Sequence, residues 1–220
     1  MSKGSETRYR IIQAIEDELK EKDYSEITLT DIANRAGVTP SLISYHVKSI
    51  DNAVQMLITK QQDEVIGQIY DLRTKDPLVY LFAADLLITY NIYSQKNILS
   101  FRKKYLSSTT YSNYSTNEAP KIMWDALYYE IFRIYNCELP DDVFKLMRIK
   151  DSATRKEMNL LIDYDSLSTP KEFRRFCKNL VYCGSGSLLL VAGMNKEIVD
   201  QKFKQACKIA DEIQKDKAIG

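Results

Sequence analysis

Side chains that can bind nucleic acid are concentrated in residues 28–47, TLTDIANRAGVTPSLISYHV. Their hydroxyl, phenol and imidazole groups can hydrogen-bond to phosphate oxygens and to the edges of bases. The pattern predicts two short helices joined by a turn at Gly37, which is the geometry of a helix-turn-helix. In that motif the second helix enters the DNA major groove. A plain three-helix packing unit has the same geometry, so the spacing alone leaves both interpretations open.

Residue types that start and stop helices define these two helices. Thr28 and Asp31 predict a capping box at the start of the first helix. Gly37 is expected to end that helix in the left-handed conformation. Thr39 is expected to cap the second helix, with Pro40 at its first position, where a missing N–H has no cost.

The same residues resemble the DNA-binding domain of TetR-family transcriptional regulators. The resemblance covers about residues 8–55 and includes the preceding helix and the lead-in DYSEIT. Beyond residue 55, only the number and length of the expected helices agree with the ligand-binding and dimerisation domain of that family. The positions most characteristic of the family are Thr28, Ile32, Ala33, Ala36, Gly37, Val38, Tyr45 and His46.

The resemblance implies a DNA interface built from the second helix and the start of the first. Three residues depart from the family pattern: Ser44 and Val47 stand where aromatic residues are common, and Ile50 replaces a common lysine. Each departure is expected to weaken a phosphate contact. The alternative is therefore a related module that binds a protein or sequesters a ligand without binding operator DNA. The DNA-binding positions carried over are Thr28, Thr39, Pro40, Ser41, Leu42, Ser44, Tyr45, His46 and Lys48.

The charge of the chain constrains the kind of nucleic-acid binding. The 31 basic and 30 acidic residues exclude a strongly basic coat. Residues 28–50 carry Arg35 and Lys48 against Asp31, while most acids of the first 50 residues lie within residues 16–26. Hydroxyls, backbone N–H groups and helix N-termini also contact phosphates. We therefore expect only modest non-specific affinity for DNA.

Composition predicts an all-α fold. Only 7 glycines and 5 prolines interrupt 220 residues, the hydrophobic fraction is 45%, and no useful segment alternates with a period of two. We expect an N-terminal three-helix helix-turn-helix domain over residues 1–50 and a C-terminal helical bundle over 51–220. The expected helices of the bundle span about 51–73, 77–95, 97–106, 118–137, 140–163, 170–194 and 196–215, with a polar loop at 107–117.

One carboxylate interrupts a helix that is otherwise apolar. Asp85 is the only charged residue in 77–95, so it needs a charged partner, a polar cavity or an exposed face. Arg102 and Arg133 are the candidate partners. Nearby tyrosines could supply both walls and hydroxyls to a small-molecule cavity, although aromatic stripes more often form core. The predicted effector-binding residues are Asp85, Tyr90, Tyr93, Arg102, Trp124 and Tyr128.

An apolar stripe with helical spacing runs through the last two expected helices. The resemblance implies that these helices pair with those of a second copy in a four-helix dimer interface, and an intrachain core face is the alternative. The small residues GSGS at 184–187 indicate close helix packing; they lack the order and preceding strand of a nucleophile elbow. The predicted interface residues are Phe173, Cys177, Leu180, Gly184, Leu188 and Phe203.

Several other classes are excluded or disfavoured. The four cysteines are dispersed and His46 is the single histidine, so a zinc set is not expected. No nucleophile–base pair supports an enzyme, and we expect no cofactor or metal. The start MSKGSETRYR has no apolar signal segment, and no stretch has the ~20 apolar residues of a membrane span. These features predict a cytoplasmic, ligand-responsive transcriptional regulator, a homodimeric repressor of a near-palindromic operator.

Overall fold

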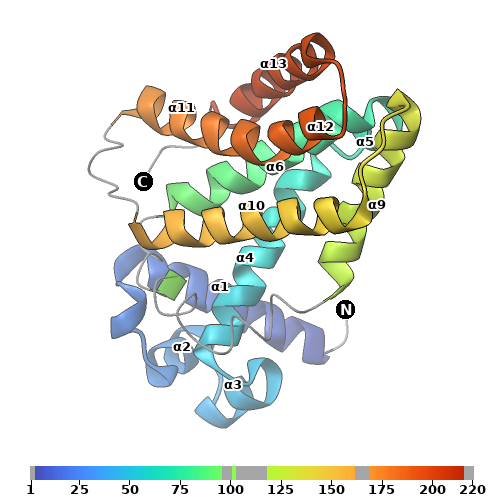
Figure 1. Ribbon diagram of the computed structural model, residues 1–220. Helices are drawn as coiled ribbons and strands as arrows, with labels where there is room; N and C mark the ends of the chain where they lie inside the picture. The colour runs from blue at the N-terminus through green and yellow to red at the C-terminus, as the bar shows by residue number, and fades with distance from the viewer. Residues whose placement is uncertain (1–2, 96–100, 103–117, 162–168, 216–220) are drawn as a thin grey trace. The chain divides into compact units, whose positions relative to one another are not determined.

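The computed structural model describes residues 3–95, 101–102, 118–161 and 169–215 (Figure 1). Every regular element within these ranges is a helix, which confirms the predicted all-α class. None of the described helices is both long enough and apolar enough to cross a membrane. The expected polar loop at 107–117 lies outside the described residues, as does all but residues 101–102 of the expected helix at 97–106.

The chain divides into two compact units, Met1–Glu64 with Gln95–Ser108, and Val65–Ser94 with Thr109–Gly220. The first unit extends past residue 50 because early turns of helix α4 (Ile50–Gly67) contact the segments before it. Tyr24 hydrogen-bonds to Asp51, and Arg8 donates to the sulfur of Met56. The compact unit is therefore longer than the predicted domain 1–50, while the functional division of the chain stays a prediction.

The first unit is built on three helices with one small apolar core. These are α1 (Lys3–Glu21), α2 (Leu29–Ala36) and α3 (Pro40–Val47), with a 3₁₀ turn, η1 (Tyr24–Glu26), between α1 and α2. Apolar residues four apart on α1 lie on one face, and that face packs against both α2 and α3. On these three helices the fully buried core positions are Ile11, Ile15, Ile32, Ile43 and Val47.

The predicted turn chemistry is confirmed at three of its four signals. Thr28 and Asp31 form a reciprocal capping box at the start of α2. Gly37 ends α2 with φ of 63° and ψ of 42°, in the left-handed region, and Pro40 opens α3. At the fourth signal, Thr39 occupies the N-cap position of α3 as predicted, but its side chain makes no capping hydrogen bond. The Thr39 hydroxyl instead lies 2.9 Å from the Ser41 hydroxyl.

The second unit surrounds one almost completely buried helix, α6 (Pro77–Ser94). This helix packs against α13 (Lys196–Ile213) and α11 (Pro170–Val181), and more lightly against α9 (Glu118–Tyr135) (Figure 1). Such burial explains why the segment is apolar around its whole circumference. The remaining elements are α5 (Leu72–Lys75), α10 (Asp141–Leu161), a π-helical turn η4 (Tyr182–Gly186) and α12 (Ser187–Val191).

Two long helices expected from the sequence are interrupted. The segment 51–73 is helix α4 up to Gly67, followed by turns and then α5. Glycine in a helix is disfavoured by about 1 kcal/mol relative to alanine, which accounts for a stop there. The segment 170–194 contains the π-helical turn η4, whose extra residue per turn changes which side chains face inward.

Candidate functional site

Helix α3 separates a buried face from a polar, exposed one. Ile43 and Val47 are fully buried and anchor the helix to the first unit. On the outer face Tyr45 is 80% exposed and Leu42 is 40% exposed. No acidic residue occurs in α3. The exposed face can therefore donate and accept hydrogen bonds without repelling a polyanion.

Of the predicted DNA-binding residues, all but Thr28 lie on α3 or at its ends. His46 is half-buried, and its ring meets the Tyr45 ring edge-on at 5.0 Å between centroids. Thr28 lies at the start of α2, and its hydroxyl is used in the capping box with Asp31. The predicted positions that are exposed are Thr28, Thr39, Pro40, Ser41, Leu42, Ser44, Tyr45 and Lys48.

The structure changes the interpretation of two departures from the TetR pattern. Val47 is fully buried, so it fills the core and has no surface with which to reach a phosphate. Val47 itself therefore makes no phosphate contact, and the effect of this departure on DNA binding stays a prediction. Ser44 is exposed, and its hydroxyl donates weakly to the Pro40 carbonyl at 3.5 Å. Ile50 is half-buried at the start of α4.

Lys48 has an unusual backbone conformation at the end of α3. Its φ is 65°, in the region that residues other than glycine seldom occupy. Its backbone N–H donates to the Ser44 carbonyl at 3.1 Å, and its side chain is exposed. Such a conformation costs on the order of 1–3 kcal/mol and persists only where surrounding structure fixes it. Val47, directly before Lys48, is fully buried.

The acidic end of α1 is neutralised within the first unit. Arg35 donates to Glu18 at 2.6 Å and to both carboxylate oxygens of Glu21. Lys22 pairs with Glu18 and Asp31, each at 3.1 Å. Hydrogen bonds from Thr28 and Lys22 lower the pKa of Asp31 to about 2, so it remains charged at neutral pH. Ion pairs thus hold four of the eight acids in the first 50 residues, namely Asp17, Glu18, Glu21 and Asp31.

In the second unit, Asp85 forms an internal ion pair. Its Oδ2 accepts from Arg155 Nη2 at 2.9 Å and from Ser185 Oγ at 2.7 Å. Of the three environments considered from sequence, the internal pair is confirmed, but neither proposed arginine is the partner. Arg133 is exposed on α9, and Arg102 belongs to the first unit. The partner Arg155 lies on α10, 70 residues along the chain.

This ion pair is part of a larger buried network. Arg155 also donates to Asp151 at 3.0 Å and to Thr89 at 3.2 Å. Tyr128 donates to Ser185 at 2.8 Å. Burial raises the pKa of Asp151 above its ordinary value. The network therefore joins α6, α9, α10 and the π-helical turn through groups that satisfy one another.

The other predicted effector residues also take part in contacts within the chain. Tyr90 is buried and donates to Asp211 at 3.0 Å, and Lys178 pairs with the same carboxylate. Burial raises the pKa of the Tyr90 phenol. Tyr93 donates to the Arg155 backbone carbonyl at 3.4 Å. Trp124 is half-buried on α9. The structure brings Asp85, Tyr93 and Tyr128 together around Arg155 and Ser185, which the sequence did not identify.

Most of the predicted dimer residues lie in the core of their own chain. They have little surface left for a partner, so this part of the prediction is corrected in favour of the intrachain alternative. Gly184 faces α10: a Cβ built there would lie 2.1 Å from Asp151 Oδ1. Phe203 is half-buried and lines a surface depression. The four core positions are Phe173, Cys177, Leu180 and Leu188.

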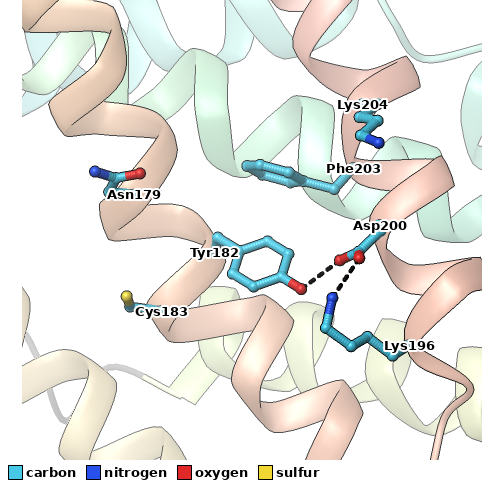
Figure 2. A pocket seen from close by; sticks show the side chains of 7 residues that line it. All are labelled: Asn179, Tyr182, Cys183, Lys196, Asp200, Phe203 and Lys204. Atoms are coloured by element: carbon cyan, nitrogen blue, oxygen red, sulfur yellow. Dashed lines mark hydrogen bonds and ion pairs between the residues drawn. The ribbon is translucent and has the colours of Figure 1, made fainter.

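Figure 2 shows that depression, a shallow open hollow of about 390 Å³ between the α11–η4 segment and α13. Tyr182 points toward Asp200 and donates to it at 2.5 Å, and Lys196 approaches the same carboxylate. The Tyr182 and Phe203 rings meet edge-on at 5.0 Å. The remaining lining residues are Asn179, Cys183 and Lys204.

Comparison of the chain with protein-family models and with curated proteins finds no match.

Proposed function

We propose that the protein is a transcriptional regulator that binds duplex DNA with helix α3, in the manner implied by the TetR resemblance. The observation that carries the proposal is the division of α3, a short helix with no acidic side chain, into two faces. Tyr45 on the outer face is 80% exposed, while Ile43 and Val47 are fully buried. A rigidly anchored helix with hydroxyls and an aromatic ring outward suits insertion into a major groove. The ion pairs that Arg35 and Lys22 form with acids of α1 also favour this role.

The second unit would sense a small molecule and pair with a second copy. Two copies would place their α3 helices about 34 Å apart, one turn of DNA, on a near-palindromic operator. Effector binding would lower operator affinity only if the effector bound one conformation of the dimer more tightly than the other. The all-helical second unit, centred on α6, supports this assignment by its architecture.

Tyr45→Ala should weaken binding to the operator by about tenfold or more, since a good base contact contributes about 1–3 kcal/mol. Helicity should be unchanged because the side chain is mostly in solvent. The measurement is a gel shift at fixed salt with the full chain and promoter DNA flanking its own gene. Tyr70→Ala is the matched control, because Tyr70 is 67% exposed outside the first unit. Equal affinity of the two variants would place Tyr45 outside the interface.

The resemblance implies that the two copies meet through the last two long helices, whose exposed side carries the depression of Figure 2. Two single substitutions test this surface. Cys183 is exposed in the depression of Figure 2, and Leu146 is 64% exposed on α10. Cys183→Arg should weaken dimerisation about tenfold or more, because a two-fold axis buries the unpaired guanidinium twice. Leu146→Arg should leave it unchanged. Sedimentation velocity over a dilution series measures both, and the reverse pattern would move the interface to α10.

A further inference from the structure

Cations of the first unit differ in whether an acid pairs with them. Arg35, Lys20 and Lys22 are held in ion pairs with the acids of α1 and α2. By contrast, neither Arg10 nor Lys48 forms an ion pair with any residue that the structure describes, and both side chains are exposed. Arg35, Lys20 and Lys22 offset internal charge. Arg10 and Lys48 are available to an anionic partner.

Arg10 reaches from α1 to the turn that precedes α3. Its Nη1 lies 4.0 Å from the position that a Cβ would take on Gly37. Because Gly37 has no side chain, nothing on that residue covers the guanidinium. No sequence pattern distinguishes Arg10, because its place beside the turn depends on the packing of α1 against α2 and α3.

Lys48 occupies the other end of the same helix. It follows Val47 directly, and its positive φ turns the chain away from the axis of α3. An eight-residue helix is about 12 Å long at about 1.5 Å per residue. The major groove is also about 12 Å wide. One cation therefore lies near each end of α3, about one helix length apart.

We propose that Arg10 is a phosphate-binding residue that, together with Lys48, clamps the DNA backbone on either side of α3. This inference rests on the proposed function and adds a contact outside the motif itself. The guanidinium donates two parallel hydrogen bonds to a phosphate, and these fix the register of α3 without reading sequence. The acid-free surface of α3 between the two cations is the part that reads bases.

The test is the salt dependence of DNA binding by the full chain. Arg10→Gln should lower the slope of log K against log salt concentration by about 0.9, the effect of one lost phosphate contact. Affinity should fall about fivefold to tenfold at 0.1 M salt, equally for operator and for random duplex. Lys20→Gln is the matched control: it removes one positive charge from the same helix, about 15 Å away.

Three outcomes separate the inference from the function on which it rests. A reduced slope for Arg10→Gln but not for Lys20→Gln supports the clamp. Equal slopes for both variants and the unaltered chain, with DNA still bound, would overturn the clamp and leave α3 as the DNA-binding element. Failure of the unaltered chain to bind any duplex would overturn the proposed function together with the clamp.

Discussion

Arg155→Met should destabilise the second unit by about 3–5 kcal/mol, because it leaves two mostly buried carboxylates without their cation. The side chains of Asp85 and Asp151 are only 13% and 15% exposed. Methionine keeps much of the volume of arginine, so lost packing contributes little. Denaturant unfolding followed by the fluorescence of Trp124 measures the effect, because this single tryptophan lies on α9 of the same unit.

The pH dependence of that loss identifies its cause. Burial already raises the pKa of Asp151 above its ordinary value, and loss of the Arg155 charge should raise this pKa further. A carboxyl whose pKa is higher in the folded state than in the unfolded state destabilises the fold at higher pH, where the group must be charged. The loss of unfolding free energy should therefore shrink as pH falls from 7 toward about 5. Arg175→Met, at an exposed position on α11, should change stability by about 0.5 kcal/mol or less. A deficit that is independent of pH would contradict the role given to the charges.

Gly184→Leu should destabilise the second unit by about 1–3 kcal/mol, and Gly184→Ala should do so nearly as much. The first added carbon would already lie 2.1 Å from Asp151 Oδ1 and 3.2 Å from Arg155 Nη2. Asp151 cannot swing away freely, because Arg155 holds its other oxygen at 3.0 Å. The substitution therefore strains the buried network.

Two further variants test this explanation of Gly184. Gly67→Ala adds the same methyl group where nothing lies within 4 Å, so it should be neutral or slightly stabilising. Combining Gly184→Ala with Asp151→Ala removes the clashing atom, so the loss should be smaller than the sum of the single effects. A Gly184→Leu chain that unfolds normally but no longer dimerises would restore the interface predicted from sequence.

The sequence predicted the structure correctly where the interacting groups lie only a few residues apart along the chain. The capping box of Thr28 and Asp31, the left-handed Gly37 and the first-turn Pro40 follow from backbone sterics and short-range hydrogen bonds. The apolar circumference of α6 likewise agrees with its burial. Thr39 is the exception, since its hydroxyl has Ser41 as a competing partner two residues away.

Contacts between distant segments could not be derived in the same way. Asp85 was recognised as needing a partner, but Arg155 is 70 residues away and no periodicity links them. The stripe through Phe173, Cys177 and Leu180 has the spacing of any amphipathic face, so it cannot distinguish a core from an interface. The π-helical turn adds a further shift of register that directs Ser185 inward.

The most direct test of DNA recognition by α3 is selection of binding sites from a random duplex pool with the full chain. We predict enrichment of a near-palindromic sequence whose half-sites lie about 10 base pairs apart, or a multiple of that distance. Enrichment should be lost when Tyr45→Ala replaces the unaltered chain under the same salt. A pool that stays random after repeated rounds at about 50 mM salt, where phosphate contacts are strongest, would contradict DNA binding by this protein.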